Sequence, residues 1–261
     1  MENKIRVAVA GARGRMGSEV VKMVLADDTL QLVCGIDPRV AGEDNDSPFP
    51  YVADVETAIR EYKPEVLVDF TIPAVVKQNM ITAIHAGVRP VVGTTGLSAE
   101  EVQNLRDLCN EHQVGAIIAP NFAIGAILMM KFAQEAAKYM PHVEIMELHH
   151  DQKLDAPSGT AIKTAELIQQ TRNEMKQGHP EEKEIIEGAR GGYYDGFRIH
   201  SIRLPGLVAH QECLFGALGQ TLSIRHDSIN RESFMPGVNL AVKKVVGINE
   251  LVYGLEHVMF E

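Results

Sequence analysis

The first 120 residues alternate between short apolar runs and longer amphipathic runs, and this alternation constrains the fold more than any other feature. The amphipathic runs carry apolar residues at helical spacing, as in 18–28, where Val20, Val21 and Val24 cluster. Short strands that alternate with helices are typical of parallel β-α-β units, whose strands are buried on both faces. We therefore predict a doubly wound parallel sheet, with strands at 5–11, 30–37, 65–71, 89–96 and 114–121 and helices at 18–28, 55–62, 74–87 and 98–112.

The pattern changes after about residue 122. A long helical stretch at 125–140 leads to a strand at 142–150, and a second amphipathic helix is predicted over 158–176. Residues 178–196 are rich in glycine and charge, which is typical of an exposed loop. Two runs of alternating apolar residues then predict a half-buried antiparallel sheet: Leu207, Ala209, Cys213 and Phe215, followed by Leu218, Leu222 and Ile224.

The last 30 residues return to a helical pattern, and we expect them to rejoin the first domain. A chain of 261 residues is long enough for two modest domains, each with a core of its own. We therefore expect an α/β domain of the dinucleotide-binding type at 1–122 plus 232–261. An α+β domain built on a mostly antiparallel sheet is expected at 123–231.

Charge and cysteine content argue against several classes of function. The chain carries 25 basic and 35 acidic residues, a formal net charge of -10, and such a surface repels the phosphate backbone of nucleic acids. Three scattered cysteines without a C-x-x-C pair argue against a disulfide scaffold and a structural zinc site. The first apolar run ends at Gly11, too early for a signal peptide, and no stretch reaches the roughly 18 apolar residues of a membrane helix. We expect a soluble, cytoplasmic protein with no nucleic-acid partner, membrane partner or metal.

A glycine-rich loop lies between the first strand and the first helix. Gly11, Gly14 and Gly17 allow a tight turn, close approach of a pyrophosphate and close packing of the helix on the strand. The helix N-terminus directs N–H groups and a partial positive charge toward the phosphates. The spacing is G-x-x-G-x-x-G, whereas the common dinucleotide motif is G-x-G-x-x-G, so a glycine-rich turn without a ligand stays an alternative.

An acidic residue follows the second strand at the distance that a dinucleotide-binding fold requires. Asp37 lies about 20 residues after Gly17, where such folds place the carboxylate that holds the adenosine ribose hydroxyls. This carboxylate repels a 2′-phosphate and therefore favours NADH, whereas Arg39 can compensate its charge or stack on adenine and so allow NADPH. The alternatives are a turn residue for the aspartate and an exposed, solvated side chain for the arginine.

Three more segments lie at predicted strand ends. In an open parallel sheet, ligands lie across the carboxyl ends of the strands. GTTG (93–96) and APNF (119–122) follow two of these ends, and FTIP (70–73) is a weaker candidate. Small residues there let a nicotinamide ring lie against the backbone, where amide and carbonyl groups can bind its carboxamide. Loops of this kind are also common as plain scaffold.

The stretch ELHHDQKLDAPSGTA (147–161) carries the most distinctive chemistry of the chain. Adjacent residues on a strand point to opposite faces and the chain lacks H-E-x-x-H, so His149 and His150 do not form a zinc pair. Lys153 attracts carboxylates and can donate a proton if its pKa is lowered. Residues 158–160 begin a helix after a proline and offer N–H donors, a hydroxyl and a dipole to an anion, although the serine can also be a plain N-cap. The stretch predicts a site that holds and protonates a small dicarboxylate.

Together, GARGRMG (11–17), GTTG, APNF and above all ELHHDQKLDAPSGTA resemble the 4-hydroxy-tetrahydrodipicolinate reductases, also called dihydrodipicolinate reductases. The likeness extends through HSIRLPGLVAHQE (200–212) to the C-terminal helix, and H-H-x-x-K-x-D-A-P-S-G-T is more specific than the glycine loop. The resemblance implies an N-terminal Rossmann-like domain completed by the C-terminal segment, a substrate-binding and oligomerisation domain between them, and a homotetramer. It also implies hydride transfer from NADH or NADPH to C4 of a cyclic unsaturated imine dicarboxylate. The product would be tetrahydrodipicolinate, in lysine and diaminopimelate biosynthesis.

The resemblance assigns roles to single residues. His149 and Lys153 match the family's proton-donating pair, which would protonate C3 of the ring after the hydride arrives. The acidic position is Asp37, where some members carry Glu, so the preference between NADH and NADPH stays open. The predicted substrate contacts are His150, Ser158, Gly159 and Thr160. The predicted cofactor contacts are Gly11, Ala12, Arg13, Gly14, Arg15, Met16, Asp37, Arg39, Gly93, Thr94, Thr95, Ala119, Pro120, Asn121 and Phe122.

Two other functions share part of this pattern. Another dehydrogenase of the same architecture, of the aspartate or homoserine type, would explain the glycine loop and Asp37 but not H-H-x-x-K followed by S-G-T. A non-catalytic, dinucleotide-binding sensor would keep the first domain but would need no proton donors in the second. The proton donors therefore distinguish the three hypotheses.

Overall fold

The computed structural model describes residues 4–40 and 47–260, so the predicted domain ends at 1–3 and 261 lie outside the described residues. The chain divides into two compact units. Unit 1 is Met1–Phe122 with Phe234–Glu261, and unit 2 is Ala123–Ser233. Each unit has a sheet and a hydrophobic core of its own, and the predicted fold class is confirmed.

Unit 1 is built on a seven-stranded sheet in the order β12-β6-β5-β4-β1-β2-β3, in which every pair is parallel. Its strands are short and apolar because helices cover both faces of a parallel sheet. All residues of β4 are buried, for example. The strands are β1 (Ile5–Ala10), β2 (Leu30–Ile36), β3 (Tyr51–Val52), β4 (Val66–Asp69), β5 (Arg89–Val92), β6 (Ala116–Ile118) and β12 (Leu251–Tyr253).

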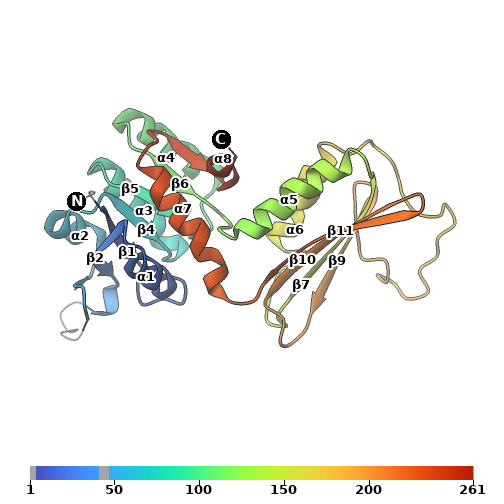
Figure 1. The fold of residues 1–261 in the computed structure, drawn as a ribbon, viewed down its shortest axis with the longest axis horizontal. Helices are drawn as coiled ribbons and strands as arrows, with labels where there is room; N and C mark the ends of the chain where they lie inside the picture. The colour runs from blue at the N-terminus through green and yellow to red at the C-terminus, as the bar shows by residue number, and fades with distance from the viewer. Residues whose placement is uncertain (1–3, 41–46, 261) are drawn as a thin grey trace. The chain divides into compact units, whose positions relative to one another are not determined.

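The helices of unit 1 form two layers, with α1 against α7 in one layer and α3 against both α2 and α4 in the other (Figure 1). The S-x-x-E pattern at 98–101 predicts a capping box at the start of α4, and the structure confirms it. Ser98 accepts a hydrogen bond from the N–H of Glu101, whose carboxylate accepts one from the N–H of Ser98. The helices are α1 (Gly17–Ala26), α2 (Val55–Tyr62), α3 (Pro73–His85), α4 (Ala99–His112), α7 (Met235–Val245) and α8 (Glu256–Met259), with a short 3₁₀ turn at Pro38–Val40. A second 3₁₀ turn, Arg231–Phe234, begins in the last residues of unit 2.

The C-terminal segment belongs to unit 1, but the prediction that it is helical throughout is wrong. Between α7 and α8 the chain adds β12 to one edge of the sheet, where it pairs with β6. Leu251 is fully buried there, and its carbonyl accepts a hydrogen bond from the Arg106 guanidinium. A strand of three residues, like the two residues of β3, offers too few positions for an alternating pattern to be recognised.

Unit 2 has a mixed, five-stranded sheet in the order β11-β10-β7-β9-β8, in which β7 and β9 are parallel and the other pairs are antiparallel. Its core joins Ala133 of α5 and Ala165 of α6 to Ile145, Phe197 and Phe215 of the strands, so both helices cover one face (Figure 1). The elements are α5 (Ile124–Ala137), β7 (His142–His149), α6 (Gly159–Gln169), β8 (Gly192–Tyr194), β9 (Phe197–Arg203), β10 (Ala209–Ala217) and β11 (Gln220–Ser228).

Helix α6 is shorter than predicted, because it ends at Gln169 and not at residue 176. The buried side chain of Arg172 explains the difference. Its guanidinium donates hydrogen bonds to the backbone carbonyls of Pro141 and Asp195, in other parts of the unit, and of Met175, shortly after the helix. These tertiary contacts outweigh the helical pattern of the local sequence.

The antiparallel strands β10 and β11 are confirmed, but they are not equally buried. Cys213 and Phe215 of β10 are fully buried. By contrast, Leu218 in the turn between the strands is fully exposed and Leu222 of β11 is also exposed. The second alternating run therefore correctly indicates a strand. Its half-buried character holds for Ile224, which packs against the core, but not for Leu218 and Leu222.

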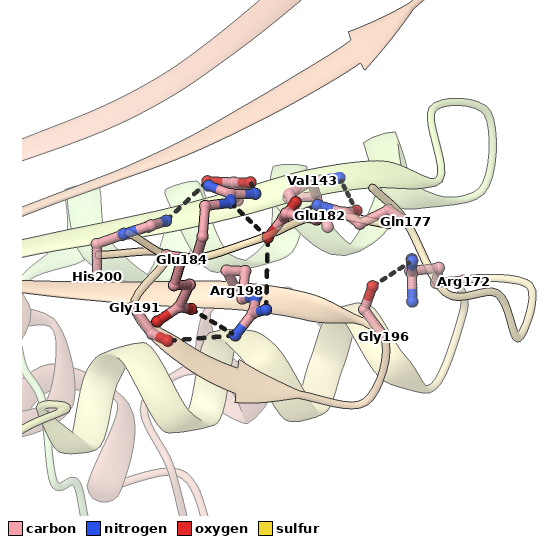
Figure 2. Close-up of polar contacts among 11 residues, drawn as sticks. Val143, Arg172, Gln177, Glu182, Glu184, Gly191, Gly196, Arg198 and His200 are labelled. Carbon is pink, nitrogen blue, oxygen red and sulfur yellow. Dashed lines mark hydrogen bonds and ion pairs between the residues drawn. The ribbon is translucent and has the colours of Figure 1, made fainter. Parts of the chain in front are cut away.

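The loop before β8 is exposed, as predicted, but the predicted range of 178–196 is too long, because β8 lies within it at 192–194. Polar contacts join this loop to the sheet (Figure 2). The Gln177 side chain bonds both the N–H and the carbonyl of Val143, at 2.9 and 2.8 Å. Arg198 of β9 lies near two loop carboxylates, those of Glu182 and Glu184, at 3.7 and 3.9 Å. Arg198 follows Phe197 on β9, and the Phe197 side chain points into the core. Because successive side chains of a strand point to opposite faces, Arg198 and the loop that it contacts lie on the sheet face opposite α5 and α6.

Candidate active site

A cavity of about 800 Å³ lies in unit 1 at the carboxyl ends of the parallel strands. Its walls come from the segments that follow β1, β2, β4 and β5, which is where an open parallel sheet holds its ligands. FTIP contributes all four of its residues, 70–73, to these walls. Of the predicted cofactor contacts, those that line the cavity are Gly11, Gly14, Arg15, Met16, Asp37, Arg39, Gly93, Thr94 and Thr95.

The glycine loop has the close geometry that a phosphate-binding turn needs. Gly11 has φ +76°, and a Cβ there would lie 2.6 Å from the carbonyl oxygen of Phe70. A Cβ at Gly17 would lie 2.0 Å from the carbonyl oxygen of Gly11, so neither position accepts a side chain. Met16, the residue before α1, lines the cavity, so the positive end of the helix dipole borders it. The loop fits the pyrophosphate of a dinucleotide.

Asp37 and Arg39 form a bidentate ion pair in the wall of this cavity. Asp37 accepts hydrogen bonds from Nε and Nη2 of Arg39 at 2.9 and 2.7 Å. The carboxylate is buried, whereas the arginine side chain is 70% exposed. The hydrogen bonds from Arg39 lower the pKa of Asp37 although burial opposes them. Arg39 therefore compensates the charge of Asp37, which was one of the alternatives that the sequence left open.

Asp69, at the end of β4, organises the same wall and was not predicted as a site residue. Its fully buried carboxylate accepts hydrogen bonds from the hydroxyls of Thr71 and Thr94 at 2.6 and 3.0 Å, and from the Asn79 amide at 2.8 Å. All three donors line the cavity. An acidic residue just before FTIP was a visible signal, but its partners on α3 and after β5 become apparent only in the fold.

Two other predicted cofactor segments have different surroundings. APNF is not among the residues that line the cavity, and the Phe122 ring packs against that of Phe70, with centroids 5.8 Å apart. Ala12 is buried, and the Arg13 guanidinium lies over the Tyr51 ring, 4.8 Å from its centroid. Cofactor contacts by these two segments stay predictions.

In unit 2, β7 ends at His149, and Glu147 lies two residues earlier on the same face of the strand. The Glu147 carboxylate is completely buried and receives His149 Nδ1 at 2.5 Å. It also receives both terminal nitrogens of Arg203, at 2.6 and 2.9 Å, and the backbone N–H of Ser158 at 3.3 Å. We call Glu147, His149 and Arg203 the Glu147 cluster.

Strand register places this cluster next to the apolar core, at the carboxyl ends of β7 and β9. Along the parallel pair β7–β9, Ile145 is opposite Ile199 in the core, and two residues further on the polar residues begin. His149 is opposite Arg203, which explains why the arginine reaches the carboxylate two residues before the histidine. The cluster is therefore a direct continuation of the core packing.

Hydrogen bonds keep the Glu147 carboxylate ionised. Burial raises its pKa, but the hydrogen bonds from His149 and Arg203 have the larger combined effect and lower the pKa from its usual value of 4.5 to about 2. The carboxylate is therefore negatively charged at neutral pH. It can accept hydrogen bonds but cannot donate them.

The loop that follows β7 carries the other predicted residues. Lys153 Nζ bonds the Asp155 carboxylate at 2.6 Å, and the Arg203 guanidinium holds the Asp155 carbonyl at 2.8 Å. Ser158 is buried and caps α6 by accepting a hydrogen bond from the N–H of Ala161 at 3.2 Å. His150, Gly159 and Thr160 lie at the two ends of this loop, and His150 and Gly159 are exposed. Glu147 and Arg203 thus connect the segments that carry His149, Lys153 and Ser158.

Sequence reasoning did not single out Glu147 or Arg203, although both lie in quoted motifs. The spacing of two residues between Glu147 and His149 was a usable signal, because it places both on one face of a strand. Arg203 lies 56 residues further along the chain, and the register of β9 alone brings it to the site.

Three further findings concern membrane-spanning helices, metal-binding clusters and disulfides in the described residues. No helix within residues 4–40 and 47–260 is both long enough and apolar enough to cross a membrane. The same residues contain no group of three or more His, Cys, Asp or Glu side chains placed to hold a metal ion. The three cysteines are buried free thiols.

Comparisons with known proteins agree on one family. Residues 5–122 match the family model "Dihydrodipicolinate reductase, N-terminus" and residues 125–259 match the corresponding C-terminus model. The chain is 58% identical to the 4-hydroxy-tetrahydrodipicolinate reductase of Halalkalibacterium halodurans and 55% identical to that of Geobacillus thermodenitrificans. Each match covers 98% of this chain and 99% of the relative.

A solved structure, the dipicolinate-bound dihydrodipicolinate reductase from Paenisporosarcina sp. TG-14, matches with a TM-score of 0.91 and 49% identity. The match covers 98% of this chain and 100% of that one. The glycine loop, the acidic residue after β2 and the histidine-lysine loop after β7 thus occur in a chain that resembles these reductases from end to end. The chain belongs to the dihydrodipicolinate reductase family.

Proposed function

We propose that this chain reduces 4-hydroxy-tetrahydrodipicolinate to tetrahydrodipicolinate with NAD(P)H, in lysine and diaminopimelate biosynthesis. The reaction consumes the hydroxylated ring, NAD(P)H and one proton, and it yields tetrahydrodipicolinate, NAD(P)⁺ and water. Family membership supports the reaction and the pathway. The observation that carries the proposal is the Glu147 cluster, which holds a histidine beside a lysine-bearing loop and a helix N-terminus.

The loop after β7 is suited to a cyclic dicarboxylate. Lys153 supplies a positive charge, and the start of α6 supplies the Ser158 hydroxyl and the backbone N–H groups of residues 159 and 160. His150 is exposed at the other end of the loop and can donate a further hydrogen bond. The solved relative from Paenisporosarcina contains dipicolinate, itself a ring with two carboxylates, which supports this class of ligand.

The chemistry divides between the two units. Loss of the 4-hydroxyl and a C3 hydrogen as water first gives the conjugated dihydro ring. The reduced nicotinamide, when bound, would supply the hydride for C4 of that ring. His149 donates the proton that C3 requires, and Lys153 stabilises the charge that develops on the ring. A positioned proton donor contributes about 10²- to 10⁴-fold to such a rate. The residues proposed to hold the cofactor are those of the glycine loop, the Asp37–Arg39 pair and the Asp69 network around Thr71 and Thr94.

We further propose that the chain accepts both NADH and NADPH. Asp37 favours the ribose hydroxyls of NADH, but Arg39 already neutralises its charge. The exposed Arg39 guanidinium can also turn to the 2′-phosphate of NADPH. Replacement of Arg39 by Ala is expected to raise the KM for NADPH more than that for NADH, because it removes the phosphate's partner and exposes the Asp37 charge.

Location and assembly follow the family. We propose a cytoplasmic enzyme that assembles as a homotetramer. Size-exclusion chromatography with light scattering tests the assembly, since a tetramer has four times the mass of the 28.7 kDa chain.

The direct test generates the substrate in place. Aspartate semialdehyde, pyruvate and the preceding synthase are mixed with this chain, and cofactor absorbance is followed with NADH and NADPH in separate reactions. Oxidation that requires both the synthase and the chain supports the proposal, and the ratio of the two rates measures the preference. A folded chain that binds the cofactor but oxidises neither form would contradict it.

A further inference from the structure

We infer that Glu147 is the positioning residue of the site: it fixes His149 so that Nε2 is the nitrogen that exchanges protons with the substrate, and it anchors the loop that binds the substrate's carboxylates. This inference rests on the proposed function and deepens it. Three arguments support it: the geometry around Glu147, the His149 tautomer that an ionised Glu147 requires, and the contrast with a second cluster on the same strand.

The Glu147 carboxylate is held from four directions. Oε2 receives His149 Nδ1 at 2.5 Å and Arg203 Nη1 at 2.9 Å. Oε1 receives Arg203 Nη2 at 2.6 Å and the Ser158 N–H at 3.3 Å. With no exposed surface, the carboxylate cannot exchange any of these donors for water. The orientation of the His149 ring is therefore fixed by a group that itself has little freedom.

An ionised Glu147 also fixes which ring nitrogen of His149 carries a hydrogen. Because the pKa of Glu147 lies far below neutrality, the carboxylate only accepts, so Nδ1 of His149 must be the donor. Nε2 is then the proton carrier. In the donating step the Nε2–H bond of the imidazolium breaks and its electron pair stays on the ring. The C3–H bond of the substrate forms from the electron pair of the reduced ring, and neutral His149 keeps its hydrogen on Nδ1.

The same carboxylate anchors the second half of the substrate loop, from Asp155 to Ser158. It receives the N–H of Ser158 at the start of α6 directly. Through Arg203 it also holds the backbone of Asp155, whose carboxylate bonds Lys153 Nζ. The proton donor and the groups proposed to bind carboxylates are therefore positioned from one buried carboxylate. A change that removed both of its oxygens would reach all of them, whereas the amide of Gln keeps one accepting oxygen.

A second carboxylate on β7 provides a matched control. Glu144 bonds His200 Nε2 at 2.7 Å and Arg190 Nη2 at 2.5 Å, so it repeats the combination of carboxylate, histidine and arginine. Its side chain is 27% exposed and lies on the face covered by the 177–191 loop (Figure 2 shows His200 on that face). We call Glu144, His200 and Arg190 the Glu144 cluster.

The experiment compares Glu147→Gln with Glu144→Gln in the coupled assay and by NMR. The amide in Glu147→Gln is the same size as the carboxylate and can donate to Nδ1, which allows His149 to place its hydrogen on Nε2. We expect kcat to fall at least about tenfold, with an upper bound near the ~10⁴-fold loss that a wrong histidine tautomer causes in serine proteases. The KM should change by less than about threefold, because the amide oxygen still accepts from Ser158. Glu144→Gln should stay within about twofold of the parent kcat.

The NMR arm uses protein labelled with ¹⁵N-histidine at about pH 8.5, where an ordinary histidine is neutral. The difference from a His149→Gln spectrum assigns the resonance. The parent chain and Glu144→Gln should show His149 with its hydrogen on Nδ1, and Glu147→Gln should show hydrogen on Nε2 in part or in full. A parent spectrum with hydrogen on Nε2 would overturn the inference even if Glu147→Gln does not fold.

Two further outcomes would also overturn it: equal kcat values for the two glutamine variants, or a lowered kcat in Glu147→Gln with an unchanged tautomer. Failure of the proposed function gives a different result, because the parent chain would then show no synthase-dependent oxidation. The tautomer spectrum does not depend on turnover, so the two failures are distinguishable.

Discussion

Strand β7 carries two carboxylates, each joined to a histidine and an arginine, and the two clusters differ mainly in burial. Glu147 points toward α5 and α6 and has no exposed surface, whereas the Glu144 side chain is 27% exposed beneath a loop. The Glu147 cluster engages Nδ1 of its histidine and the Glu144 cluster engages Nε2. The same three residue types can therefore serve two purposes: the Glu147 cluster positions a reacting group, and the Glu144 cluster attaches a loop to the sheet.

The difference in burial also changes how much folding free energy is lost when one partner of a cluster is removed. The pKa of Glu144 is lowered, with burial opposed by hydrogen bonds from Arg190 and His200, and that of Glu147 is lowered to about 2. Loss of one partner from a buried pair leaves a charge without compensation and costs about 3–5 kcal/mol. For a partly exposed pair such as Glu144–Arg190 the cost is smaller and approaches the ~0–1 kcal/mol of exposed pairs, because water can replace much of the lost partner.

The largest expected difference is in stability. Arg203→Ala leaves the Glu147 charge buried without its main partner, so we expect the free energy of unfolding to fall by about 3–5 kcal/mol. Arg190→Ala, in the Glu144 cluster, should cost no more than about 1 kcal/mol. Urea denaturation followed by circular dichroism measures both. Similar losses for the two variants would mean that burial does not distinguish the clusters.

A smaller effect concerns substrate binding beside the Glu147 cluster. Lys153→Ala removes a charge-assisted contact to a carboxylate, worth about 1.5–3 kcal/mol. The KM for the cyclic substrate should therefore rise roughly 10- to 100-fold, with a loss of turnover as well. Lys183→Ala, in the loop that covers the Glu144 side, is the control and should leave both constants unchanged. A normal KM in Lys153→Ala would count against the binding role.

The smallest effect is a difference in acid stability. The folded pKa of Glu147 lies below its usual value of 4.5, so its charge stabilises the fold above about pH 5, and this contribution is lost as pH falls toward about 2. We expect it to decrease by roughly 1–2 kcal/mol between pH 6 and pH 3.5. Unfolding of the parent chain and of Glu147→Gln across this range isolates the contribution, which the variant should lack. Parallel pH curves would refute the assignment.

Local patterns in the sequence predicted much of the fold. The strands and helices around the glycine loop follow from apolar periodicity, and Ser98 with Glu101 marked the start of α4. The pattern could not indicate β12, which has three residues, or the early end of α6, which depends on carbonyls that Arg172 meets far along the chain. Tertiary contacts decided those elements.

The candidate site also has residues that a local motif could predict and residues that only tertiary contacts bring to it. His149 and Lys153 were recognisable because they lie within one compact motif. Arg203 and the donors to Asp69 come from distant segments, and only strand register and helix packing bring them to their carboxylates. The buried carboxylates were therefore the part of the site that the sequence could not assign, since their function depends on neighbours that are remote in the chain.

The most direct test of this account compares the two histidines of β7 and β9. His149→Gln and His200→Gln are assayed side by side for kcat with substrate generated by the synthase. We expect kcat to fall ~10²- to 10⁴-fold in His149→Gln. In His200→Gln, kcat should change by no more than about twofold. An unchanged rate in His149→Gln, or equal losses in the two variants, would contradict the claim that the buried cluster holds the proton donor.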